Sequence, residues 1–286
     1  MMRPIRSYFF SRVPVSLASG VFLVLAAAVS ISTAQGQPAA KKSSPTSKLY
    51  VADLTGQSQM DDGEHVTQLA KNDVRAPEGT TIETKVDSTD SLVLSNGTAI
   101  YVAPETHFAV KRFLQEPFTP NRNDLDDEPS VSQTVVEIAR GSLGLCTSKL
   151  VAGSTMTYRT PEATISIRGR RLLIETLANE TRVSVIEGDV TVVGDEGGQG
   201  EVLHGGQRAI IHRTTPNGQP VIKVEPIPDD QTSKLDDTVS LACISRRTVY
   251  FESVPNVNGT NDVVAVRTTP AAAPADYTVS PSRINP

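Results

Sequence analysis

The sequence contains no tryptophan, and only two cysteines and four histidines are present among its 286 residues. So few cysteines exclude a disulfide-dense scaffold. Cysteine and histidine are also the usual zinc ligands, and a zinc site takes three or four ligands, so the sequence offers little for one. The G-x-S-x-G, H-E-x-x-H, C-x-x-C and phosphate-loop signatures are also absent. We therefore expect a protein that is not an enzyme and that uses no cofactor and no metal.

Basic residues are scarce relative to acidic ones. The chain has 27 Lys and Arg against 32 Asp and Glu, a formal net charge of −5. Binding to nucleic acid is dominated by neutralisation of phosphates by Lys and Arg. The charge balance therefore excludes nucleic acid as an expected partner.

Long apolar runs are missing except at the N-terminus. Three arginines precede an uncharged stretch that is densest over 21–29, and Ser32-Thr33-Ala34 then supplies small residues. This order predicts a signal peptide, residues 1–34, cleaved after Ala34, and hence a periplasmic or secreted protein. The alternative is a retained anchor over 13–31, just long enough to span a bilayer. A membrane contact is expected only through this segment, if it is not cleaved.

Cys146 and Cys243 are the only cysteines, and the sequence leaves their state open. In an oxidising compartment they can form one bridge. They can equally be two buried small hydrophobic residues.

Short alternating apolar runs separated by glycine turns fill residues 49–225, after a polar flexible leader over 35–48. The clearest is "LVLSNGTAIYVAP", which begins at Leu92. Asn96 and Gly97 stand between two alternating runs and predict a hairpin with a type I′ turn.

The same pattern recurs along the domain, and 5% aromatic residues with 19 glycines and 19 prolines favour strands and turns. We predict an all-β domain over 49–225 whose stacked hairpins form a β-sandwich or a solenoid-like stack. An insertion over 111–130 is predicted to be a surface loop, because it carries three prolines. Residues 226–286 are predicted to hold one extra strand, over 244–252, and a Pro-rich tail. The residues expected at structural turns are Gly79, Asn96, Gly97, Gly169, Gly188 and Gly206.

The order of these segments resembles the FecR domain, an all-β exported module. The resemblance covers about residues 49–215, and "FLQEPF" and "EPSVSQTVVEI" resemble a subgroup of exported members. Two positions depart from the family pattern: Asn72 stands where glycine is usual, and Arg170 where threonine is usual. The resemblance implies the exported half of a sensing system without its cytoplasmic output half. The matching positions are Glu78-Gly79, Asn96-Gly97-Thr98, Thr160-Pro161, Arg168-Gly169, Gly188 and Gly206-Gln207.

Arg168, Arg170 and Arg171 form the candidate contact for an anion or a partner, since three guanidinium groups near one turn can clamp a carboxylate or phosphate. The alternative is a solubilising turn. We expect a non-enzymatic, exported FecR-like β module that binds a protein or cell-envelope partner. The alternatives are a sensing component of iron-siderophore-type sigma-factor signalling and a cryptic envelope-polysaccharide hydrolase using acids of the 116–128 segment.

Overall fold

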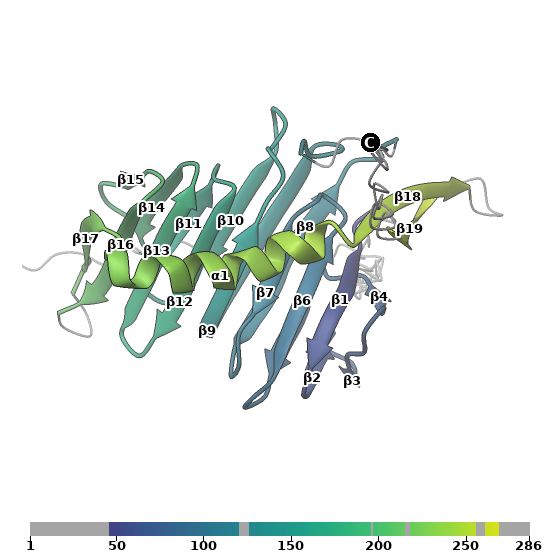
Figure 1. Cartoon of the computed structure of the whole chain (residues 1–286), viewed down its shortest axis with the longest axis horizontal. Helices are drawn as coiled ribbons and strands as arrows, with labels where there is room; N and C mark the ends of the chain where they lie inside the picture. Colours follow the sequence, from purple (N-terminus) through teal and green to yellow (C-terminus); the bar gives the residue numbers. More distant parts are fainter. Residues whose placement is uncertain (1–45, 120–125, 196, 215–217, 256–260, 269–286) are drawn as a thin grey trace, which may run out of the picture. The chain divides into compact units, whose positions relative to one another are not determined.

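The computed structural model of the chain describes residues 46–119, 126–195, 197–214, 218–255 and 261–268 (Figure 1). The expected signal peptide, most of the leader and the end of the proline-rich tail lie outside the described residues. Among the described residues, none of the helices has the length and apolar character needed to cross a membrane.

The expected all-β architecture is confirmed, and the strands form two layers that do not close into a barrel. Neighbouring strands pair antiparallel in both layers, except that β9 and β10 are parallel. Layer A contains, in spatial order, β4 (Val74–Arg75), β1 (Leu49–Thr55), β6 (Thr89–Leu94), β7 (Ala99–Val102), the end of β9 (Ser132–Cys146), β12 (Arg171–Leu177), β13 (Glu180–Glu187), β16 (Gln207–Arg213) and β17 (Pro220–Pro226). Layer B contains β3 (Val66–Gln68), β2 (Ser58–Asp61), β5 (Thr80–Thr84), β8 (His107–Gln115), the start of β9, β10 (Thr155–Arg159), β11 (Ala163–Ile167), β14 (Val190–Gly194) and β15 (Glu201–Leu203).

Strand β9 belongs to both layers. Its first part pairs with β8 in layer B up to Arg140, and its last part pairs with β12 in layer A from Gly141 onward. The chain bends between them at Gly141, whose φ is +93°. A Cβ atom there would lie 2.4 Å from the Cα of Thr106, so only glycine fits.

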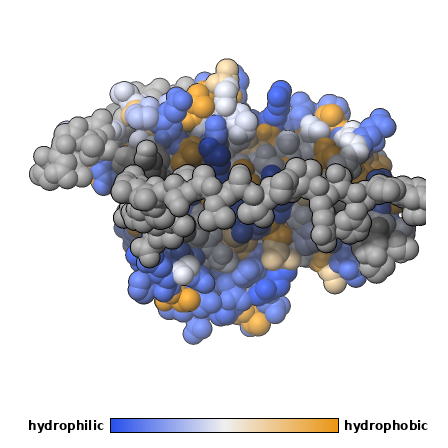
Figure 2. Space-filling view, turned by 180° about the vertical axis from the view of Figure 1, so that it is seen from behind, coloured by the Kyte–Doolittle hydropathy of each residue, from blue (hydrophilic) through white to orange (hydrophobic). Residues whose placement is uncertain are grey.

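The main hydrophobic core lies between the layers and takes every second side chain of the strands, as the alternation predicted. Leu92, Leu94, Ile100 and Val102 are all buried in it. Side chains on the outer face of layer B contact solvent, and the described residues seen from behind are mostly hydrophilic with scattered hydrophobic ones (Figure 2).

Most of the predicted glycine turns are present, but they do not form hairpins. At Gly79, Gly169, Gly188 and Gly206 the chain crosses from one layer to the other, because the strands before and after each glycine lie in different layers. Apolar alternation is the same whether the next strand lies beside the last one or opposite it, so the pattern could not separate the two.

The predicted hairpin at Asn96-Gly97 joins β6 to β7 as expected, but its turn is not type I′. Gly97 has a φ of +83°, whereas Asn96 is not among the non-glycine residues with positive φ in the described part of the chain. The Gly97 N–H donates to the Leu94 carbonyl and the Leu94 N–H donates to the Thr98 carbonyl. This is a three-residue loop with glycine at its left-handed position.

The predicted loop over 111–130 is wrong for its first part. Strand β8 continues to Gln115, and Phe113 within it is fully buried. The prolines that argued against a strand lie beyond this point, so the connection begins only at Glu116.

The prediction for the C-terminal part is also wrong in detail. Helix α1 (Asp229–Arg246) was not expected, and the predicted strand over 244–252 begins only at Val249. Strand β18 (Val249–Pro255) pairs with β19 (Asn261–Arg267) in a separate two-stranded sheet. Helix α1 runs across the strands of layer A (Figure 1).

Candidate functional site

Helix α1 and strand β18 cover an apolar strip on the outer face of layer A. Tyr50, Val93 and Ala99 lie on this face, and Ala242 of α1 and Phe251 of β18 pack against them. At 25 cal/mol per Å² of apolar area, burial of such side chains contributes on the order of 1–3 kcal/mol each. The residues that follow the β-domain are therefore part of one packed structure with it.

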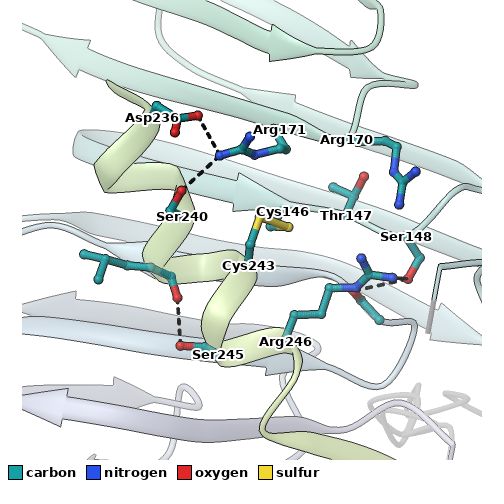
Figure 3. Close-up of a disulfide and its surroundings, with 12 residues drawn as sticks. Cys146, Thr147, Ser148, Arg170, Arg171, Asp236, Ser240, Cys243, Ser245 and Arg246 are labelled. Carbon is teal, nitrogen blue, oxygen red and sulfur yellow. Dashed lines mark hydrogen bonds and ion pairs between the residues drawn. A yellow bond between two sulfur atoms is a disulfide. The ribbon is translucent and has the colours of Figure 1, made fainter. Parts of the chain in front are cut away.

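A disulfide joins α1 to this face. Cys243 of α1 is bonded to Cys146 at the end of β9, 97 positions earlier, with 5.2 Å between their Cα atoms (Figure 3). This separation lies within the ordinary range for a disulfide. Of the two states that the sequence left open, the structure shows the bridge.

Arg171 ties a second point of α1 to layer A. Its Nη2 lies 2.7 Å from Oδ1 of Asp236 and donates to Oγ of Ser240 at 3.0 Å (Figure 3). Both partners are on α1, so this guanidinium group holds the helix and does not face an external ligand.

The other two arginines of the predicted cluster point elsewhere. Arg170 donates to Asp126 at 3.1 Å, and the Arg168 side chain is exposed. The structure therefore does not bring the three guanidinium groups to one point. Gly169 between them is not among the glycines with positive φ, and a Cβ atom there would lie 3.2 Å from the carbonyl oxygens of Glu187 and Asp189, a tight contact.

A cavity of about 220 Å³ lies where the β-domain meets the end of α1 and the start of β18. We call it the junction cavity. It is lined by Val93, Ser95, Gly97, Phe118, Thr119, Asp127, Glu128, Pro129, Ser148, Arg246, Val249, Tyr250 and Phe251.

One wall of the junction cavity is polar and rigidly held. Arg246 is only 9% exposed, and its Nη2 donates to Oγ of Ser148 at 2.9 Å (Figure 3). Glu128 is 3% exposed, and its carboxylate accepts hydrogen bonds from the Ser132 hydroxyl and from the Val151 N–H. Buried charges persist when they are paired and hydrogen-bonded in this way.

The other wall is apolar and aromatic. Phe118, Tyr250 and Phe251 supply rings, and Val93 and Val249 supply aliphatic surface. Rings opposite a guanidinium group and carboxylates suit a ligand group with an apolar body and a hydrogen-bonding end.

The junction cavity lacks a nucleophile with a base beside it, within the residues that the structure describes. The Ser95 hydroxyl is bonded to the Thr46 carbonyl and the Gln115 side chain, and Ser148 donates to the Gly97 carbonyl. No histidine lines the cavity. This arrangement can bind a group through its polar and apolar walls.

The histidines and acidic residues do not gather into a metal site in the part of the chain that the structure describes. His204 and His212 lie in different layers, and Nδ1 of His204 is 2.7 Å from Oδ1 of Asp189. Asp124, one of the acidic residues of the 116–128 segment, lies outside the described residues.

A buried carboxylate stands apart from these sites. Asp90 of β6 is 1% exposed, and removal from water raises its pKa to about 6. Only Oδ2 has a hydrogen-bond partner among the described residues, the hydroxyl of Ser58, while Oδ1 has none.

Sequence reasoning missed Arg246, Phe118 and Tyr250 as site residues, because Phe118 was placed in a surface loop and Arg246 and Tyr250 in one extra strand with no partner named for it. A signal for α1 was present. Leu235, Val239 and Ala242 recur at helical spacing, and two aspartates follow Pro228 in the first turn.

Comparison with known proteins finds the family described as FecR protein, whose model matches residues 80–191. No protein with a curated description matches the chain. Two crystal structures, at 2.50 and 1.65 Å resolution, of "a putative anti-sigma factor from Parabacteroides distasonis ATCC 8503" are similar at 20% sequence identity and a TM-score of 0.38. The similar part covers 51% of this chain and 60% of that protein.

Proposed function

Since residues 80–191 form a FecR domain, we propose that this protein is an exported, non-enzymatic binding module that recognises a protein partner of the cell envelope through the junction cavity. The observation that carries the proposal is the make-up of that cavity. Its walls come from the FecR domain on one side and from the segment 246–251, beyond the matched residues, on the other.

The way the two sides are joined supports a binding role. The disulfide and the Arg246–Ser148 hydrogen bond both cross between them, so the walls are held in place before a ligand arrives. Pre-organised walls lower the entropy lost on binding.

Export is supported by the N-terminal sequence pattern and by the disulfide, since structural disulfides persist in oxidising compartments.

A side chain of a partner protein suits the cavity volume of about 220 Å³. The aromatic or aliphatic part of the partner's side chain would pack on Phe118 and Phe251, and its polar end would reach the wall that contains Arg246.

The hydrolase alternative is less well supported by the cavity than a binding role. Of the acidic residues that it would use, Asp127 and Glu128 line the cavity, but Glu128 is held by two hydrogen bonds and is buried. A general acid must be free to exchange its proton with the substrate.

A photocrosslinking amino acid placed at Phe118 tests the proposal, with the same group at Glu64 in the exposed turn between β2 and β3 as the control. In cells that express the protein, we expect a discrete crosslinked envelope protein from position 118 and none from position 64. Equal crosslinking at both positions, or none at position 118 in correctly folded protein, overturns the proposal.

A further inference from the structure

A second hollow, of about 450 Å³, is lined by residues of layer B and shares none of them with the junction cavity. It is formed by the connection 147–154, which leads from β9 back to β10, together with the outer ends of β10 and β11. We call it the cationic cleft. Its size is within the range of small-ligand sites.

Two unpaired positive charges line the cationic cleft. Lys149 and Arg168 are both exposed, and neither side chain has a hydrogen-bond or ion-pair partner within the described residues. Their neighbours in sequence differ in this respect, since Arg170 is bonded to Asp126 and Arg171 to Asp236.

Negative charge is absent from the lining, as far as the described residues show. Acidic residues lie beside the cleft, since the backbone of Lys149 is hydrogen-bonded to Asp126 and Glu128 and bridged to Asp127. The carboxylate of Asp126 is engaged with Arg170, that of Glu128 with Ser132 and Val151, and that of Asp189 with His204. The chain as a whole carries more acidic than basic residues, 32 against 27. The lining of the cleft therefore carries two positively charged side chains and no acidic one, although the protein as a whole is acidic.

Hydroxyl groups line the floor of the cleft. Thr155 and Thr157 of β10 and Ser166 of β11 alternate with buried residues and so point outward. Thr157 and Ser166 are directly opposite each other across the two strands. Within the described chain these three hydroxyls have no side-chain hydrogen bond, so they are available as donors and acceptors.

The walls of the cleft are fixed by the fold. The Thr147 hydroxyl donates to the Gly169 carbonyl at 2.7 Å, and the Thr147 N–H donates to the Arg170 carbonyl at 2.9 Å. The Ser132 N–H donates to the Ser154 hydroxyl at 2.9 Å. These bonds hold the 147–154 connection against the turn that carries Arg168.

We propose that the cationic cleft binds an acidic saccharide, with Lys149 and Arg168 contacting its negatively charged groups and the Thr155, Thr157 and Ser166 hydroxyls contacting its sugar hydroxyls. An exposed charge pair contributes only about 0–1 kcal/mol, so a lone small anion would be held weakly. A saccharide adds several hydrogen bonds to the two charge contacts. This inference concerns a different surface from the junction cavity and does not depend on it.

The experiment measures binding of a short oligogalacturonate to the mature protein by isothermal titration calorimetry at low salt. We expect the single variants Lys149→Gln and Arg168→Gln each to weaken binding by roughly 3–10-fold, and the double variant to lose it. Binding should also weaken as salt is raised. Lys234→Gln, on the exposed side of α1, removes the same charge elsewhere and should leave binding unchanged.

Four results would overturn the proposal. The first is equal weakening by Lys234→Gln, which would show a non-specific charge effect. The second is equal binding of a neutral malto-oligosaccharide. The third is binding of inorganic phosphate or of phosphatidylglycerol vesicles through Lys149 and Arg168 without binding of oligogalacturonate, which would assign the cleft to a phosphate group. Absence of any oligogalacturonate binding by folded protein also refutes it.

Discussion

The hydroxyl of Ser58 donates a 2.5 Å hydrogen bond to Oδ2 of Asp90 in the interior of the sandwich. The two residues belong to different layers, Ser58 to β2 in layer B and Asp90 to β6 in layer A. Both side chains are almost fully buried. A single hydrogen bond does not replace the water that a carboxylate loses on burial, and the pKa of Asp90 is raised to about 6 for this reason.

This raised pKa makes stability depend on pH in a defined direction. The folded protein favours the protonated form of Asp90, so its contribution to the unfolding free energy is fully present below the ordinary pKa of 3.8 and is lost as pH rises through about 6. Asp90→Asn removes this titration and keeps an oxygen for Ser58 to donate to. We expect the variant to be more stable than the parent at pH 7.5 by on the order of 1–2 kcal/mol, and no more stable at pH 3.5.

Urea denaturation of both proteins at a series of pH values measures the effect. A difference in unfolding free energy that stays constant from pH 3.5 to 7.5 would show that folding does not shift the pKa of Asp90.

Loss of the Cys146–Cys243 disulfide should destabilise the protein by about 2–5 kcal/mol, because it closes a long loop and holds α1. The double variant Cys146→Ser/Cys243→Ser tests this in urea denaturation, with reduction of the parent protein by dithiothreitol as the matched control. The two treatments should give the same loss. We also expect hydrogen exchange in α1 to become faster than in β9; equal rates before and after removal would argue that the disulfide does not hold the helix.

Substitutions at Gly188 and Gly206 distinguish the cost of close packing from the cost of backbone strain. Both have a left-handed φ, +93° and +86°. A Cβ atom at Gly188 would lie 2.4 Å from the Cα of Gly169, whereas a Cβ atom at Gly206 would meet nothing within 4 Å. Gly206→Ala should cost roughly 1–2 kcal/mol from backbone strain alone, and Gly188→Ala about 1–3 kcal/mol more from overpacking. Thermal or urea unfolding compares the two variants. Equal losses of stability would contradict the close contact between Gly188 and Gly169.

Arg171 and Arg168 should differ in their effect on stability although they are three positions apart. Arg171→Gln breaks the contacts to Asp236 and Ser240 and should cost about 0.5–1 kcal/mol, a modest amount because Asp236 is well exposed. Arg168→Gln should change the unfolding free energy by less than about 0.5 kcal/mol, since this side chain is exposed. The urea midpoints of the two variants give the answer, and a larger loss for Arg168→Gln would contradict the structure.

The core could be predicted from sequence because burial of every second residue leaves a direct mark on it. In "ATISIRGRRLLIE" the alternation predicts that Ile165 and Ile167 point inward and that Leu172 and Ile174 return to the same core, and all four are buried there. The sequence could not show that they return from the opposite layer. Both routes bury the same residues, and the difference lies in the pairing of β11 with β14 and of β12 with β9.

The candidate site was harder to predict because it depends on contacts between distant segments. Phe118, Ser148 and Arg246 come together only when α1 lies across layer A. The sequence places Phe118 in a loop and Arg246 in an extra strand, and it assigns no role to Ser148. The short helical pattern around Val239 is weak because its exposed side also carries Leu241 and Ile244, so polarity does not mark the buried face.

The double membership of β9 has a mechanical consequence. A pull on the chain that slides one layer past the other must break the hydrogen bonds of this strand on both sides at once, because it is bonded to β8 and β10 in layer B and to β7 and β12 in layer A. The two layers are therefore joined through one continuous strand, and a force transmitted through the domain should find its first weak point at the outermost strands β3, β15, β4 and β17, which pair with one neighbour each.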